Sequence, residues 1–354
     1  MNFSSNHEYT QYILRKWLVL AILSALMIGV GLLSLSVGAA RLPLLEILRV
    51  LIGAGEDTSR IIILNVRLPR IAAAISVGLA LAMAGCIMQN VLRNPLASAS
   101  TLGISQGASF GAAVAIVYFG AGIHTGVSGT AIMAANPAVI TVFAFWGGIS
   151  TTILILFLSY RSGAVPSTMI LAGVAIGAMF TGATALVQYF ADDVHVGSIV
   201  YWTFGNLGRP GWQEIRMLIL LNIAGFIYFV FNRWNYNAME SGVHTAKSLG
   251  VNVDTLILIS MVVSTLISAT AIAFVGTINF IGLIAPHIVR KFVGNDYRFL
   301  IPCSALMGAI VMLAADIASR MIQPPAVLPI GALTSFLGAP LFLYMIIKKG
   351  NMVK

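Results

Sequence analysis

The side chains best able to do chemistry in this sequence are a few charged residues within long apolar segments. Asp316 lies inside one such segment, and Arg320 follows at the i,i+4 spacing that suits an ion pair on a helix. A carboxylate at the centre of a bilayer costs about 2.5–3.5 kcal/mol on the insertion scale, so Asp316 needs a partner. We interpret Asp316 and Arg320 as a structural intramembrane pair, although any intramembrane charge is also a candidate functional site.

Two further arginines flank the dipeptide Leu68-Pro69, just before another apolar segment. Pro69 predicts the first turn of a helix and an extended conformation for Leu68. Arg67 and Arg70 at such a helix start can reach lipid headgroups, or they can pair with carboxylates of a protein that docks there. The residues alone favour the lipid contact and leave the docking contact open.

Catalytic and metal-binding motifs are missing from the sequence. It has no Gly-rich segment ending in Gly-Lys-Ser/Thr, no His-Glu-x-x-His motif and only two cysteines. We therefore expect no catalytic residue, no metal site and no cofactor in this chain, and no ATP hydrolysis by the chain itself. Gln106 lies in an apolar segment and must find a hydrogen-bond partner. We interpret Gln106 as a contact between helices rather than with a substrate.

The composition indicates a membrane protein. Of the 354 residues, 59% are apolar and only 9% are charged, whereas a soluble domain carries roughly 25% charged residues. The net charge of +9 reports membrane topology rather than nucleic-acid binding. We therefore expect an all-α polytopic membrane protein that forms one transmembrane domain over residues 1–354.

Apolar segments long enough to cross the bilayer predict about ten helices. Arg15 and Lys16 near the start, with Lys348, Lys349 and Lys354 at the end, place both termini in the cytoplasm by the positive-inside rule. The predicted spans are 17–40, 71–92, two within 94–160 on either side of a polar stretch at 120–136, 162–191, 215–231, two within 255–289, 299–318 and 328–347.

The longest polar segment on the predicted inner side runs from residue 237 to 254. Its alternating polar and apolar residues, with breaks at Gly242 and Gly250, predict two short amphipathic helices against the cytoplasmic face. Such helices can insert into a groove of another protein, although an ordinary solvated loop has the same composition.

These motifs together resemble the permease subunits of iron-siderophore and cobalamin ABC importers (FecCD-like), over nearly the whole chain. The resemblance rests on Arg67-Leu68-Pro69-Arg70, Asn94-Pro95-Leu96-Ala97, Leu102-Gly103-Ile104-Ser105, the segment from Phe280 to Arg290, Ala315-Asp316 with Arg320, and Leu328-Pro329-Ile330-Gly331. It implies the fold of a type II ABC importer permease in a prokaryotic cell membrane. Its implied partners are a second permease subunit, two cytoplasmic ATPases that bind ATP, an extracytoplasmic solute-binding protein and a metal chelate.

The resemblance also implies roles for individual residues. Arg67, Arg70 and Arg320 match positions that receive acidic residues of the binding protein, and Ser167 and Thr168 fall at the cytoplasmic gate. The segment 237–252 matches the coupling helices that contact the ATPase. Its candidate contact residues are Met239, Glu240, Ser241, Gly242, Ala246, Leu249 and Gly250.

We therefore expect a permease that moves a metal chelate, with ferric siderophore as the first choice and heme or cobalamin behind it. An ion-coupled secondary transporter is the alternative, because such transporters also carry intramembrane acids. An intramembrane enzyme is a third class, which the missing catalytic motifs disfavour.

Overall fold

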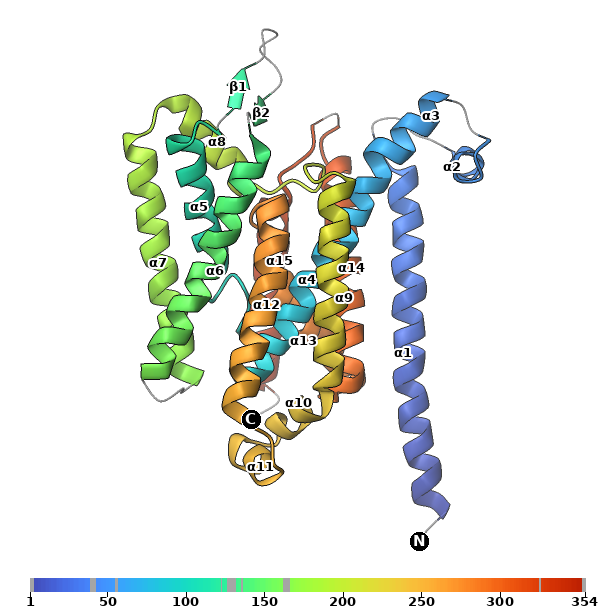
Figure 1. Ribbon diagram of the computed structural model, residues 1–354. Coiled ribbons are helices and arrows are strands. Elements are labelled where there is room, and N and C mark those ends of the chain that lie inside the picture. The colour runs from blue at the N-terminus through green and yellow to red at the C-terminus, as the bar shows by residue number, and fades with distance from the viewer. Residues whose placement is uncertain are drawn as a thin grey trace.

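The computed structural model describes residues 3–38, 43–54, 57–121, 123–125, 132–134, 136–161, 166–324 and 326–351. Almost all of them are helical (Figure 1). The elements are α1 (Phe3–Ser36), α2 (Leu44–Leu51), α3 (Asp57–Ile61), the π-helical turn η1 (Ile62–Arg67), α4 (Leu68–Val91), α5 (Ile104–Tyr118), β1 (Ile123–Thr125), β2 (Ile132–Ala134), α6 (Pro137–Arg161), α7 (Pro166–Phe190), α8 (Asp193–Thr203), α9 (Trp212–Phe231), α10 (Arg233–Glu240), α11 (Val243–Ser248), α12 (Val253–Val275), α13 (Ile281–Val293), α14 (Tyr297–Met321) and α15 (Ile330–Asn351).

Seven helical stretches in the described part of the chain are long and apolar enough to cross a membrane. They contain α1, α4, α6, α7, α9, α12 and α14. The three other predicted spans correspond to α5, α13 and α15, of which α5 and the first part of α15 are shorter apolar helices. The helices therefore fall where the apolar segments predicted them, while the number that crosses the bilayer stays a prediction.

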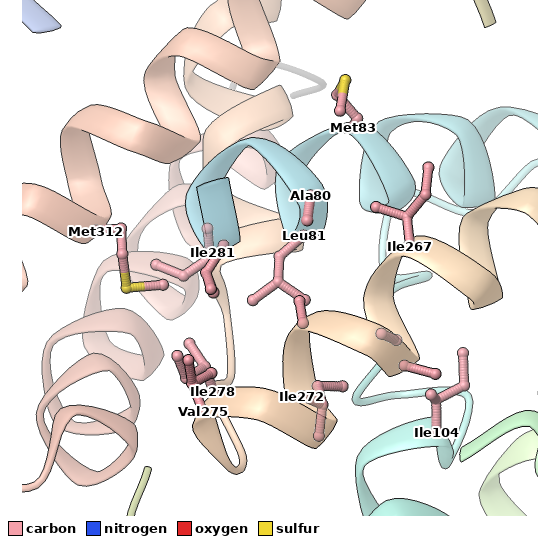
Figure 2. Packing of buried hydrophobic residues seen from close by; sticks show 14 of the residues in the cluster. Ala80, Leu81, Met83, Ile104, Ile267, Ile272, Val275, Ile278, Ile281 and Met312 are labelled. Carbon is pink, nitrogen blue, oxygen red and sulfur yellow. The ribbon is translucent and has the colours of Figure 1, made fainter. Parts of the chain in front are cut away.

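Helix α4 forms the centre of the molecule. In an apolar window of 18 residues within the stretch that contains α4, 83% of residues are buried, against 17% in the corresponding window of α1, which lies at one edge of the bundle (Figure 1). Helices α9, α12, α13 and α14 pack around α4. Figure 2 shows this core, where Ala80 and Leu81 of α4 share a cluster with Val275 from the end of α12 and Ile281 from the start of α13.

The close packing around α4 depends on paired glycines. A Cβ atom added to Gly85 would lie 2.1 Å from the backbone oxygen of Gly282 in α13, and one added to Gly78 would lie 2.4 Å from the oxygen of Gly308 in α14. Glycines allow the backbones of neighbouring membrane helices to come into direct contact. These pairs fix how α13 and α14 sit against the central helix.

The start of α4 differs from the prediction. Leu68 is helical (φ −63°, ψ −45°) rather than extended, and its N–H donates to the carbonyl of Ile63 in a wide π turn. Proline normally clashes with the carbonyl four residues earlier, and the wider turn gives the Pro69 ring room. Consequently α3, η1 and α4 continue into one another, and Arg67 and Arg70 lie within a helix rather than at its start.

The two ends of the bundle carry different small elements. Strands β1 and β2 pair antiparallel, with His124 opposite Met133, and lie at the same end as α2 and α3 (Figure 1). This strand pair is a small addition to an otherwise all-helical fold, as predicted, and falls in the polar stretch at 120–136. The opposite end carries α10 and α11, together with the start of α1 and the end of α15 (Figure 1). We call these the hairpin end and the α10–α11 end.

Candidate functional site

At the hairpin end, Asp316 lies between two arginines. Its carboxylate is fully buried and contacts Arg70 Nε at 2.7 Å and an Arg320 guanidinium nitrogen at 2.9 Å. Arg320 is the predicted i,i+4 neighbour, whereas Arg70 comes from α4, 246 residues away in the sequence. We call Arg67, Arg70, Asp316 and Arg320 the arginine cluster. The two guanidinium groups supply this buried carboxylate with opposite charge and with hydrogen-bond donors.

The remaining bonds of the cluster hold the end of α1. The last carbonyl groups of a helix have no partner within it. Arg320 donates to the Val37 carbonyl at 2.6 Å and to the Ser34 hydroxyl at 2.5 Å, and Arg67, which is only 6% exposed, donates to the Leu35 carbonyl. Arg67 therefore fastens the end of α1 to η1, Arg320 fastens it to α14, and their charged groups point into the protein.

Arg70 also lines a cavity. This cavity has a volume of about 330 Å³ and lies between α8 and the segment before α15. Tyr201, Phe204, Asn206 and Leu328 contribute to its walls. Of the three arginines predicted to dock a partner, Arg70 is thus the one that a carboxylate entering from the hairpin end could reach with the least rearrangement.

At the opposite end, α10 and α11 are the two short helices that the polar segment predicted, with α10 beginning earlier, at Arg233. Gly242 has φ +119° and separates them. Met239 and Ala246 are fully buried, whereas Leu249 is 68% exposed, and Glu240, Ser241 and Gly250 are also exposed. The predicted coupling residues therefore divide into two that hold the helices on the body and an exposed group that a partner can contact.

Hydrogen bonds anchor α10 to the first turn of α14. Asn237 donates to Asp296 at 3.2 Å and accepts from the backbone N–H of Tyr297 at 2.8 Å. Asp296 also pairs with Lys16 and Arg298. Burial raises the pKa of Asp296, but the hydrogen bonds from Arg298, Asn237 and Lys16 outweigh it and hold that pKa well below its usual value. The carboxylate is therefore a permanent acceptor for this anchor at neutral pH.

The remaining predicted residues lie apart from these groups. Ser167 is exposed and Thr168 half-buried in the first turn of α7, and their role at a gate stays a prediction. Among the described residues, no group of three or more His, Cys, Asp or Glu side chains is placed to hold a metal ion.

Two features escaped prediction from the sequence. The first is the Arg70–Asp316 pair, which joins distant segments; Arg320 already provided Asp316 with a partner in the sequence, so no signal pointed to a second one. The second feature is the cavity that Gln106 lines, where its side-chain oxygen has no hydrogen-bond partner; its interpretation as a contact between helices stays a prediction.

Comparison with protein families identifies the chain. The model of the FecCD transport family matches residues 25–348. The chain belongs to the FecCD transport family. FecCD proteins are multi-pass membrane permeases of ABC transporters, which lack an ATPase site of their own and work with ATPase subunits and a second permease subunit.

Individual relatives agree with this membership. A protein of Methanocaldococcus jannaschii named "Putative ABC transporter permease protein" is 52% identical over 89% of this chain and 90% of its own length. The iron(3+)-hydroxamate import permease FhuB of Bacillus subtilis is 35% identical over 88% of this chain and 78% of its own. The hemin transport permease HmuU of Yersinia pestis is 34% identical over 81% of this chain and 83% of its own.

A solved structure has the same fold. The structure described as "An inward-facing conformation of a putative metal-chelate type ABC transporter" superposes with a TM-score of 0.81 and 29% identity, covering 93% of this chain and 99% of that chain. The FecCD fold therefore extends over nearly all of the present chain.

Proposed function

We propose that this FecCD permease carries a metal chelate, with ferric siderophore as its first candidate cargo and heme or cobalamin behind it. The observation that supports this most is the FecCD match over residues 25–348, which covers both the arginine cluster and the α10–α11 segment. The relatives named for hydroxamate and hemin transport differ in cargo at similar identity, so the family alone does not select one chelate. In this proposal residues 1–354 form one transmembrane domain.

The proposal places the α10–α11 end in the cytoplasm of a prokaryotic cell. That end carries the start of α1 with Arg15 and Lys16, and the end of α15 (Figure 1). Cytoplasmic ends of membrane proteins are enriched in Lys and Arg. The hairpin end then faces outward, toward a solute-binding protein.

The binding protein docks on the hairpin end through carboxylates. Arg70 receives one of them at the 330 Å³ cavity, because its side chain reaches the cavity wall while it pairs with Asp316. Arg67 and Arg320 contribute by holding α1 in place, and they engage the partner directly only if their bonds to α1 open. Carboxylate–guanidinium pairs have the directional geometry that such docking needs.

The ATPases act on the exposed part of α10 and α11. Glu240, Ser241 and Leu249 offer polar and apolar contacts to a groove. Movement of this segment passes to α14 through Asn237 and Asp296, and α14 carries Asp316 at its other end. A single helix, α14, thus connects the proposed ATPase contact with the proposed docking site.

The ion-coupled alternative finds little support in these contacts. Asp316 is the buried acid that such a transporter would use, but two arginines already neutralise it. An ion-coupling acid must instead exchange a proton or cation during transport.

Uptake by cells tests the proposed cargo. A host strain that lacks this chain is supplied with iron-55 bound to a hydroxamate, a citrate or heme, and accumulation is compared with the parent strain. The proposal expects loss of uptake for at least one chelate and recovery when the chain is restored. Unchanged uptake of every chelate, together with unchanged cobalamin uptake, contradicts it.

A further inference from the structure

A second cavity, of about 300 Å³, lies between α5, α7 and the segment that follows α12. It is separate from the arginine cluster and from the α10–α11 segment. Six of its ten lining residues carry hydroxyl groups, three carry carboxamides and one is alanine, and none is charged. They are Ser105, Gln106, Ser109, Thr181, Thr184, Ala185, Gln188, Thr203, Thr277 and Asn279.

The position of the cavity follows from close packing at the start of α5. Gly103, with φ +82°, lies directly against Gly177, near the middle of α7. Beyond this contact the cavity is lined by Thr181, Thr184 and Gln188, in the part of α7 nearer the hairpin end. Thr181 and Ala185 are exposed, so the cavity opens on that face of α7.

Most hydroxyl groups around the cavity already have partners in the protein. Thr181 and Thr184 donate to carbonyls of their own helix at 2.9 and 2.8 Å, and Thr277 donates to the Thr203 carbonyl at 2.5 Å. Asn279 donates to the Ser335 hydroxyl at 3.2 Å. These bonds fix the side chains and leave their oxygen lone pairs available to a ligand.

Two buried polar groups of the lining have no hydrogen-bond partner. Ser105 is only 3% exposed, and neither its hydroxyl nor the side-chain oxygen of Gln106 makes a hydrogen bond in the structure. A buried polar group without a partner costs about 1–3 kcal/mol. Such groups therefore usually meet a ligand or an ordered water when the protein works.

We propose that this cavity is a cargo subsite that binds the uncharged, oxygen-rich and amide-rich periphery of a chelate and disfavours anionic chelates. The inference rests on the proposed function and adds a substrate class to it. Hydroxyl and carboxamide groups complement the carbonyl and amide groups of a ligand. An anionic chelate loses its hydration on entry and meets no cation in return, because no charged residue lines the cavity.

The net charge of a chelate then decides whether this cavity favours it as a cargo. Three hydroxamates balance the charge of Fe³⁺, so a ferric trihydroxamate is neutral, whereas ferric citrate is anionic and heme carries two propionates. At about 300 Å³ the cavity lies at the lower end of the range of roughly 300–1,000 Å³ for pockets that enclose drug-sized ligands, so we expect it to hold one lobe of a chelate rather than all of it. A partial site with few hydrogen bonds also lets the cargo leave readily.

Protection of an introduced thiol tests the subsite directly. Ala185→Cys, at an exposed residue of the lining that offers no polar side-chain group to a ligand, is labelled in the detergent-purified chain with a maleimide in the presence of a neutral ferric trihydroxamate or of ferric citrate. The native Cys86 and Cys303 are both buried, which keeps the background low. We expect protection by the trihydroxamate and none by ferric citrate at equal concentration. Absence of protection, as from a cavity that holds only water, or equal protection by both probes overturns the proposal.

Transport of the same probes provides the second measurement. Ser105→Ala and Gln106→Leu each remove one unpartnered group, and we expect about five-fold slower uptake of the trihydroxamate, the effect of one lost hydrogen bond. Ser264→Ala removes a buried unpartnered hydroxyl that does not line the cavity, and uptake should stay at the parent rate. Parent-rate uptake by both cavity variants overturns the subsite.

The two measurements separate the subsite from the proposed function. Thiol protection needs neither ATP nor partner subunits. Protection without ATP-dependent uptake of any chelate contradicts the proposed function and supports the subsite, whereas uptake without protection overturns the subsite alone. Failure of both overturns both.

Discussion

At the scale of single residues, the Asp316 carboxylate accounts for the position of two arginines. Arg70 from α4 and Arg320 from α14 meet on a side chain with no exposed surface. Removing one partner of a buried ion pair leaves the other charges uncompensated, which is far more costly than the pair itself is stabilising. The arginine cluster is therefore needed for the stability of the fold, whether or not a partner also docks on it.

Substitution of Asp316 should consequently destabilise the fold. We expect Asp316→Asn to lower the free energy of unfolding by about 3–5 kcal/mol, because Arg70 and Arg320 stay buried without a counter-charge. Thermal unfolding of the detergent-purified protein measures the effect. Asp193→Asn, at an exposed site in the first turn of α8, serves as the matched control and should unfold near the parent temperature. Equal melting temperatures for both variants contradict the assigned role of Asp316.

A test of docking requires a substitution that disturbs the fold less than Asp316→Asn does. Arg70→Lys keeps a cation near Asp316 but loses the planar group that binds a carboxylate with two parallel hydrogen bonds. We expect the affinity for the solute-binding protein to fall about ten-fold, measured by binding to reconstituted vesicles, while the melting temperature changes little. Arg60→Lys, at an exposed residue of α3, is the control. If both variants bind with parent affinity, Arg70 does not dock the partner.

Asp296 predicts a defined pH dependence at the α10–α11 end. Its pKa in the folded protein lies below the unfolded value of about 3.9, so its stabilising effect is complete above that value and is lost as the pH falls further. Asp296→Asn keeps the helix cap but removes the charge. We expect the variant to melt a few degrees below the parent at pH 5–8, with a gap that narrows below about pH 4. If the difference in melting temperature between Asp296→Asn and the parent widens as the pH falls, the Asp296 carboxylate is not the ionised acceptor described here.

At the scale of helices, close backbone contacts around α4 determine the packing. Helices pack in a bilayer mainly through van der Waals contact, so the Gly85–Gly282 pair has no easy substitute. We expect Gly85→Ala to push α4 and α13 apart and to reduce the yield of monodisperse protein severely, because its Cβ would lie 2.1 Å from a backbone oxygen. Gly29→Ala in α1, where no atom lies within 4 Å of the added Cβ, should give the parent yield of monodisperse protein, measured by size-exclusion chromatography. Equal yields would show that the α4–α13 contact is looser than described.

The helices also show how much of the structure could be predicted from the sequence alone. Apolar segments in a bilayer have few options besides helices, so the helix positions and the two short helices α10 and α11 followed from composition and breaks. The π turn before Pro69 did not, because the X-Pro rule concerns single peptide conformations and not the hydrogen-bond register of a preceding helix. The Arg70–Asp316 pair did not follow from the sequence either, because residue spacing along one helix does not show which residues of another helix it contacts.

The cavity near Ser105 illustrates the limit for functional sites. Its hydroxyl and carboxamide groups come from α5, α7, the end of α8 and the segment after α12. Each residue alone has the composition of an ordinary membrane helix, and only their position in space makes an uncharged polar site. The sequence did point to Gln106 as a polar group in need of a partner, but it could not tell whether another helix or a cargo provides it.

At the scale of the whole molecule, the proposed contacts lie at opposite ends of one helical bundle. Helix α14 is anchored to α10 at Asp296 and to α1 and α4 at Asp316 and Arg320. This arrangement suits a conduit whose energy comes from a partner at one end and whose cargo comes from a partner at the other. The chain itself then contributes the pathway and the mechanical connection.

Reconstituted transport distinguishes a conduit that is driven by ATPases from a carrier that is coupled to ions. Proteoliposomes with ATP inside and chelate-loaded binding protein outside are prepared with the parent permease, with and without its ATPase subunits. We predict iron-55 uptake only when the ATPases are present, and no loss of uptake when an ionophore dissipates ion gradients. Uptake by the permease without any ATPase, abolished by the ionophore, would contradict it.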